Sequence, residues 1–180
     1  MMSATLQRIL PDDVLNFKTP VSGYLCPLEA NIYDIQFQAF EVKDYESGRT
    51  VYSSSTPTAY PVYPGDDPLR SVRYTFPAEF LTFKTIRTAL TFSVGTLPAN
   101  NFRMVEMHYF KGELVRVYDF PFGFCIPDST NSWEQIYDVP EYSHEQIEEY
   151  ISSPFGHTSD SFYFVDDKLV IHNKAEYQYA

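Results

Sequence analysis

Two ionisable side chains, two residues apart in an apolar run, are the first residues in this sequence that could do chemistry. Glu106 and His108 lie within NNFRMVEMHYF. A buried charge is costly unless it is paired or hydrogen-bonded. Either this stretch reaches solvent near Glu106, or a polar group arrives to meet the carboxylate. From the residues alone, a satisfied pair in a sheet is the ordinary interpretation.

Other chemistry is weakly supported. The four histidines are His108, His144, His157 and His172. They show no HxH or HExxH spacing, and there is no CxxC, so we expect no metal site. A Cys or Ser nucleophile could still meet a histidine in space, but no GxSxG motif or Gly-rich phosphate loop is present. We therefore expect neither an enzyme nor a bound cofactor.

A β-hairpin would position Glu106 and His108. Alternate residues of a strand share a face, so one face carries Met104, Glu106, His108 and Phe110. The opposite face carries Arg103, Val105, Met107 and Tyr109. After a turn at 111–113, the return strand places on one face Leu114, Arg116, Tyr118, Phe120, Phe122 and Phe124. One side of the hairpin is thus rich in aromatic rings.

Short strand patterns recur along the rest of the chain. They cover residues 32–43, with a slip in period typical of a bulge, and residues 50–53, 72–76, 81–83, 90–94, 133–139, 161–165 and 168–172. A last extended run continues to Tyr179. Two short helices are predicted, one after Pro11 and one after the capping box at Ser143. Eight or nine strands with almost no helix predict an all-β sandwich.

Composition favours one soluble, acidic domain. With 180 residues the chain fits a single domain, 1–180, of which we expect about the first ten residues to be flexible. The formal net charge is −11, and no basic stripe suggests nucleic acid or an anionic membrane surface as a partner. Aromatic residues make up 17% of the chain. So many rings exceed the needs of a thin sandwich core and suit a lined cavity.

The expected location is the cytoplasm. Cys26 and Cys125 are the only cysteines, and the start lacks a signal-peptide pattern, so we expect free thiols in a reducing compartment. No apolar run reaches the ~18 residues of a membrane span, so we expect no stable membrane insertion.

Residues 54–69 are rich in proline and read as a long surface loop. The spacing of Pro61 and Pro64 gives a PxxP, a weak signal for an SH3 ligand. This leaves open a non-lipid adaptor that recruits protein partners and whose aromatic residues form a solid core.

Longer stretches resemble a known family. NNFRMVEMHYF, YDFPFGFCIP, QIYDVPEYS and SDSFYFVDDKLVIHNKAEYQY are similar to the uncoordinated (Unc) family of myristoyl-binding solubilising factors. This family is related to the prenyl-binding delta subunit of rod phosphodiesterase and, more distantly, to the Rho dissociation inhibitors. The similarity runs from about Val14 to Tyr179. It implies an immunoglobulin-like β-sandwich with a hydrophobic lipid cavity between its sheets.

The resemblance also implies site residues. Glu106 would accept hydrogen bonds from amides at an acylated N-terminal glycine, with His108 beside it. The pocket-lining positions of the family match Phe40, Tyr74, Phe80, Tyr118, Tyr137 and Tyr163. This chain departs from the family at Ser71 and Val139, which stand where relatives have phenylalanine, and at Tyr118, which replaces another phenylalanine, so its preferred acyl-chain length is open.

The implied function is a lipid-binding chaperone that extracts and carries N-myristoylated proteins, such as G-protein alpha subunits or ciliary proteins. A GTP-bound Arf-like small GTPase would release the cargo, in the cytoplasm or at a cilium or flagellum. The acyl chain of the cargo would be the ligand, with no other cofactor. The alternatives are a prenyl-protein carrier and the non-lipid adaptor.

Overall fold

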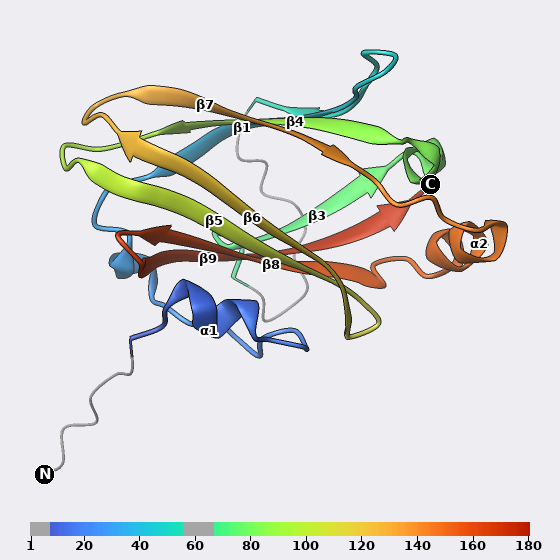
Figure 1. Cartoon of the computed structure of the whole chain (residues 1–180), viewed down its shortest axis with the longest axis horizontal. Helices are drawn as coiled ribbons and strands as arrows, with labels where there is room; N and C mark the ends of the chain where they lie inside the picture. Colours follow the sequence, from blue (N-terminus) through green and yellow to red (C-terminus); the bar gives the residue numbers. More distant parts are fainter. Residues whose placement is uncertain (1–7, 56–66) are drawn as a thin grey trace, which may run out of the picture.

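Two β-sheets pack face to face in the computed structural model, which describes residues 8–55 and 67–180 (Figure 1). The four-stranded sheet has the order β2 (Thr50–Ser54), β1 (Gln36–Asp44), β4 (Thr85–Ser93) and β7 (Thr130–Asp138). The five-stranded sheet has the order β3 (Ser71–Phe76), β9 (Lys168–Tyr179), β8 (His157–Val165), β5 (Ala99–Phe110) and β6 (Glu113–Cys125). Strands pair antiparallel except β3 and β9, which are parallel. The predicted immunoglobulin-like sandwich is confirmed.

Both predicted α-helices are present. α1 (Pro11–Leu15) begins at a proline and lies against the outer face of the five-stranded sheet (Figure 1). α2 (His144–Ser152) lies at one end of the sandwich, where Ser143 Oγ accepts a hydrogen bond from the Gln146 amide, as the capping box predicts.

The central hairpin forms as predicted from β5 and β6, but Phe124 and Leu114 were assigned to the wrong face of β6. Gly123 has a φ of 105°, open to glycine but not to other residues, and after it Phe124 is 56% exposed. Leu114 packs on the outer face of the sheet because the register shifts between His108 and Tyr109. The alternating pattern fails at both irregularities.

The predicted strand at 81–83 is also wrong. Residues Ala78–Thr82 form a 3₁₀ helix that starts after Pro77, and Thr82 Oγ1 donates to the backbone oxygen of Glu79. Local bonds of this kind compete with strand pairing. The first strand begins at Gln36 rather than residue 32, and its expected irregularity lies between Phe37 and Ala39.

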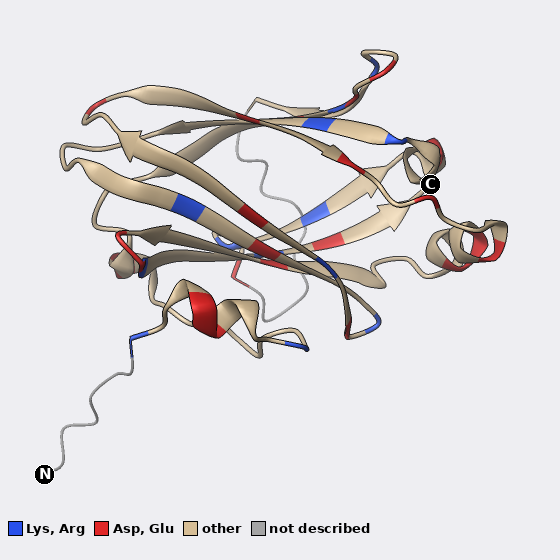
Figure 2. Cartoon of the chain, in the orientation of Figure 1, with Lys and Arg blue, Asp and Glu red and all other residues tan. Residues whose placement is uncertain are grey.

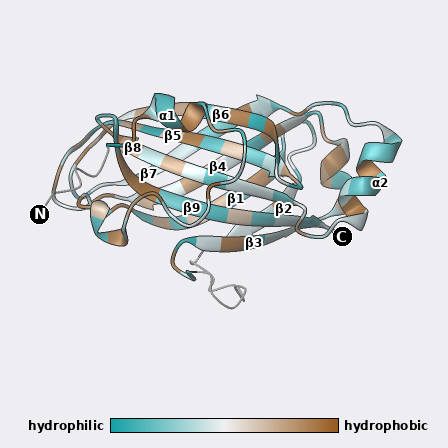
Figure 3. Cartoon of the chain, turned by 90° about the horizontal axis from the view of Figure 1, so that it is seen from below, coloured by the Kyte–Doolittle hydropathy of each residue, from teal (hydrophilic) through white to brown (hydrophobic). Residues whose placement is uncertain are grey.

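The central strands of the five-stranded sheet are buried on both faces, whereas the outward residues of β6 are exposed. The outer face of the sheet packs against α1 and the segment that follows it, so Val105, Met107 and Tyr109 are fully buried. Hydrophilic and hydrophobic residues alternate along its strands (Figure 3). At the end away from α2, the space between the sheets is filled by an aromatic core that includes Phe92, Phe102 and Trp133.

Charged residues are scattered along the described strands, helices and loops, and the Lys and Arg among them do not gather into a stripe (Figure 2). Cys26 and Cys125 are free thiols. None of the described helices is long and apolar enough to cross a membrane. The PxxP of Pro61 and Pro64, and most of the expected flexible start, lie outside the described residues.

Candidate ligand-binding site

A cavity of about 350 Å³ lies between the sheets, within the range of roughly 300–1,000 Å³ found for ligand pockets. Both sheets contribute to its wall. The structure brings all of the predicted site residues to this wall, which includes Phe40, Tyr74, Phe80, Glu106, His108, Tyr118, Tyr137 and Tyr163. Ser71 and Val139, where the resemblance implies departures from the family pattern as it does at Tyr118, line it too.

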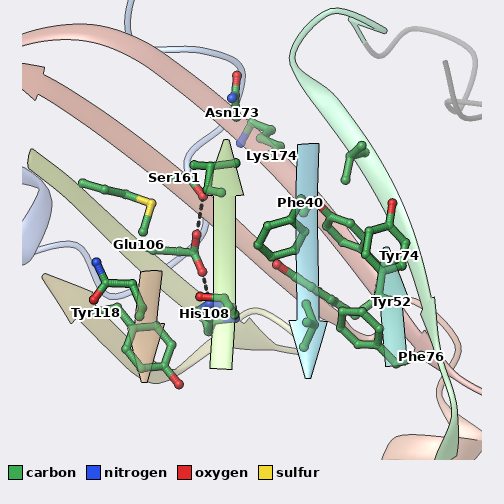
Figure 4. A pocket seen from close by; sticks show the side chains of 18 of the residues that line it. Phe40, Tyr52, Tyr74, Phe76, Glu106, His108, Tyr118, Ser161, Asn173 and Lys174 are labelled. Atoms are coloured by element: carbon green, nitrogen blue, oxygen red, sulfur yellow. Dashed lines mark hydrogen bonds and ion pairs between the residues drawn. The ribbon is translucent and has the colours of Figure 1, made fainter. Parts of the chain in front are cut away.

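One side of the cavity is a cluster of aromatic rings from β1, β2, β3 and β9 (Figure 4). The ring centroid of Tyr74 lies 5.9 Å from that of Phe40, 5.0 Å from that of Tyr52 and 5.3 Å from that of Tyr177. Phe80 reaches the wall from the 3₁₀ helix and stacks on Phe76 at 4.7 Å. These contacts provide a continuous apolar surface.

A polar group faces this surface from β5 (Figure 4). Glu106 Oε1 lies 2.5 Å from His108 Nε2, and Glu106 Oε2 accepts a 2.8 Å hydrogen bond from Ser161 Oγ on β8. Burial alone would raise the pKa of Glu106. The nearby His108 and the hydrogen bonds from His108 and Ser161 outweigh burial and lower that pKa below its ordinary value. Glu106 is therefore held as a carboxylate.

Glu106 is the only carboxylate among the described residues that line the cavity. Its side chain is 22% exposed, so it can contact a ligand in the cavity. A carboxylate oxygen accepts more than one hydrogen bond, which leaves room for N–H donors of a ligand.

A second polar group lies next to the first. Arg116 on β6 is the cross-strand neighbour of His108, and its Nη1 donates a 2.7 Å hydrogen bond to the hydroxyl of Tyr118. Its Nη2 donates to the hydroxyl of Tyr142, which precedes α2. Burial raises the pKa of Tyr118, so its phenol stays protonated.

Sequence reasoning missed several wall residues. The alternating pattern placed Arg116 on the same face as Tyr118, but Arg116 was not selected as a site residue. Tyr177 continues the inward face of β9, where the sequence predicts only an extended run. Ser161 could not be matched to Glu106, because no local pattern joins residues on different strands.

The remaining titratable cluster is structural. On the outer face, Asp160 Oδ1 lies 2.8 Å from His172 Nε2, while His172 Nδ1 accepts a hydrogen bond from the Leu25 amide. His172 Nδ1 thus binds the N-terminal segment directly, and Nε2 holds Asp160, whose other oxygen accepts a hydrogen bond from the Val21 amide. Across the described ranges, no three Cys, His, Asp or Glu side chains are grouped to hold a metal ion.

Two sheets around an apolar cavity, with one paired carboxylate on the wall, define an immunoglobulin-like sandwich that holds its ligand between the sheets. Comparison with known proteins agrees. Residues 29–179 match the family described as GMP-PDE, delta subunit. The chain therefore belongs to this family of lipid-binding carriers, whose members are binding and transport proteins.

Within the family the chain is similar to the Unc-119 proteins. It is 42% identical to Protein unc-119 homolog B of Danio rerio, over 95% of this chain and 74% of the relative. It is 42% identical to Protein unc-119 homolog B of Homo sapiens, over 97% and 73%. It is 40% identical to Protein unc-119 of Caenorhabditis elegans, over 96% and 80%.

Proposed function

We propose that this protein extracts N-myristoylated proteins from membranes and carries them by enclosing the acyl chain between its sheets. The observation that carries the proposal is the cavity itself: an aromatic chamber on whose wall Glu106 is the single carboxylate among the described residues. The rings of Phe40, Tyr74, Phe80, Tyr118, Tyr137 and Tyr163 would contact the chain. Glu106 and His108 would meet the polar head.

The energy of burial is adequate. At ~0.8 kcal/mol per buried CH₂, a chain of about 14 carbons offers on the order of 10 kcal/mol before ordering costs. A single myristoyl group holds a protein on a membrane only marginally. An apolar cavity can therefore compete with the bilayer for it.

The head of the ligand would set specificity. An acylated N-terminal glycine presents amide N–H groups, which suit the acceptor Glu106. A C-terminal prenyl-cysteine methyl ester presents no such row of donors, so the remaining lone pairs of Glu106 would lose water without gaining a ligand partner. This favours acyl over prenyl cargo.

A carrier that binds tightly needs a release step. We propose that a GTP-bound Arf-like GTPase binds the sandwich and expels cargo, in the cytoplasm or at a cilium or flagellum. G-protein alpha subunits and ciliary proteins are the proposed cargo classes. Linkage requires that cargo weaken GTPase binding by the same factor by which the GTPase weakens cargo binding.

The test is fluorescence polarisation with one labelled peptide in three forms: myristoylated at its N-terminal glycine, unmodified, and carrying a C-terminal farnesyl-cysteine. Tight binding of the myristoylated form alone supports the proposal. Preference for the farnesyl form would assign the protein to prenyl cargo, and binding of neither lipidated form would favour the adaptor. Release of bound myristoyl peptide by the GTP-loaded but not the GDP-loaded GTPase would support the release step.

A further inference from the structure

Arg116 is a cation on the cavity wall that has no carboxylate partner. Among the described residues no Asp or Glu oxygen lies within 4.0 Å of its guanidinium. Most other arginines of this acidic chain do have such a partner within that distance: Arg49, Arg70, Arg73, Arg87 and Arg103. A partly buried guanidinium held only by phenols is incompletely neutralised.

The groups around Arg116 are arranged as donors. The hydroxyl oxygens of Tyr118 and Tyr142 accept its two hydrogen bonds, so each O–H remains able to donate to a third group. The guanidinium itself has five N–H donors, of which two are used in this way. Three donor groups thus converge at the end of the cavity near α2.

The nearby titratable groups do not supply the missing anion. Glu106 is already paired with His108 and Ser161. His157 lines the same cavity, and its Nδ1 is buried without a hydrogen-bond partner. Burial, together with the nearby His108 and Arg116, lowers the pKa of His157 to about 4, so it is neutral at neutral pH.

We propose that Arg116, with the hydroxyls of Tyr118 and Tyr142, forms a second polar subsite that binds a carboxylate carried by the ligand. The planar guanidinium fork suits a carboxylate, and the charge-assisted hydrogen bonds are strong. The inference rests on the proposed function, because it deepens the recognition performed by the same cavity.

The position of the subsite limits where that carboxylate can be. Arg116 lies directly across from His108, and facing residues of an antiparallel pair have Cβ atoms roughly 5 Å apart. A carboxylate that reaches it therefore lies close to the head contacted by Glu106 and His108. It belongs either to an acidic side chain soon after the acylated glycine or to the head group of a free fatty acid.

The first arm of the test uses myristoyl peptides that differ only in Glu or Gln at each of the positions that follow the glycine. We expect the wild-type protein to bind at least one Glu peptide about tenfold more tightly than its Gln partner. Arg116→Gln should abolish that preference and change the affinity for the Gln peptides far less. Arg103→Gln is the matched control, since Arg103 is on the outer face of the same sheet, paired with Asp119.

The second arm distinguishes the source of the carboxylate. Free myristate and its methyl ester each compete with the labelled Gln peptide for the cavity of the protein. If the subsite binds a fatty-acid head group, myristate competes better than the ester with the wild-type protein and loses that advantage with Arg116→Gln. If the carboxylate comes from the peptide, Arg116→Gln abolishes the preference for a Glu peptide in the first arm, and myristate and its ester compete equally well in the second arm.

The outcomes separate the two proposals. Tight binding of all myristoyl peptides, with no Arg116-dependent preference in either arm, would overturn the carboxylate subsite and leave the carrier standing. No binding of any myristoyl peptide would overturn both. If Arg116→Gln fails to fold, the double variant Tyr118→Phe, Tyr142→Phe keeps the guanidinium, and it should lower the preference for the Glu peptide several-fold.

Discussion

Ser161 donates a hydrogen bond of 2.8 Å to Glu106 across two neighbouring strands, although the residues are 55 positions apart in the chain. With His108 on the other carboxylate oxygen, Glu106 has one protein partner at each oxygen. These two partners stabilise the anion inside an apolar cavity, and the remaining lone pairs of Glu106 can accept hydrogen bonds from a ligand. The site is built before any ligand arrives, which lowers the cost of binding.

Replacing this carboxylate should weaken acyl-peptide binding. Glu106→Ala removes the acceptor and leaves His108 and Ser161 without their shared partner. Hydrogen bonds to charged groups contribute about 1.5–3 kcal/mol, so we expect at least about a tenfold loss of affinity for a myristoyl peptide. Fluorescence polarisation measures it.

Glu134→Ala is the matched control. Glu134 is also a strand carboxylate paired with a cation, Arg87, but its side chain is 47% exposed, and it is not part of the cavity wall. Its replacement should leave the affinity within about twofold, because exposed ion pairs contribute little. Equal affinities of both variants and the wild type would remove Glu106 from the proposed site.

Cavity length can be tested at Val139, where the family resemblance leads us to expect phenylalanine in relatives. Val139→Phe adds a ring to the wall and should shift preference toward shorter acyl chains, since each CH₂ that no longer fits forfeits ~0.8 kcal/mol. A series of peptides with acyl chains of increasing length measures the shift. Ile136→Phe is the control, because Ile136 is 50% exposed on the same region of chain and does not line the cavity.

An unchanged length preference in Val139→Phe would show that the acyl chain does not reach this part of the wall. A loss of affinity for every chain length would instead indicate a blocked entrance.

The N-terminal segment depends on one buried carboxylate. The Asp160 side chain is 2% exposed and accepts hydrogen bonds from the Val21 amide, Lys174 Nζ and His172 Nε2. Asp160→Asn removes the negative charge and places the side-chain N–H group of asparagine next to the groups that donate hydrogen bonds to Asp160. We expect the free energy of unfolding to fall by about 2–4 kcal/mol, measured by urea denaturation. It should also expose residues 17–27 to proteolysis.

Asp119→Asn provides the comparison for Asp160, because Asp119 makes an ion pair with Arg103 on the surface. That variant should lower the free energy of unfolding by less than about 1 kcal/mol. Similar losses in both variants would mean that Asp160 contributes no more than a surface pair.

Sequence patterns predicted the hairpin well because alternation over β5 and β6 is nearly unbroken. They failed where the backbone departs from a regular strand: at Gly123, which turns Phe124 outward, and at the shift beside Tyr109, which sends Leu114 to the other face. At residues 81–83 the apolar spacing was read as a strand, yet local bonds after Pro77 favour a 3₁₀ helix.

The site was predicted unevenly. The spacing of Glu106 and His108 indicated a polar pair, and family resemblance selected the aromatic positions. Their distribution around one cavity depends on how two sheets stack, which no local period encodes. The Ser161 partner and the Tyr142 contact of Arg116 come from other parts of the fold, so only the structure could supply them.

His157 should make the protein less stable as the pH falls. Its ring packs among Phe110, Tyr150 and Tyr179, at centroid distances of 4.7, 4.4 and 5.5 Å. Burial, with His108 and Arg116 nearby, lowers its pKa to about 4 in the folded protein, against about 6.5 in an unfolded chain. Below about pH 6.5 the unfolded state takes up more protons, so the free energy of unfolding decreases until the pH reaches about 4.

Partial exposure reduces the effect of that shift, so we expect His157 to account for about 1–2 kcal/mol of the loss between about pH 7 and pH 4.5. His157→Phe, which suits the aromatic surroundings, should flatten the pH dependence by that amount. The rest of the slope is expected from His172, whose pKa burial also lowers, and near pH 4.5 from carboxylates such as Glu106 and Asp160, whose pKa values are lowered in the folded protein. His144→Gln is the control, since the His144 side chain is 82% exposed. A His157→Phe slope equal to that of the wild type would show that His157 has the same pKa in the folded as in the unfolded protein, and that the cavity near α2 is wetter than its aromatic lining implies.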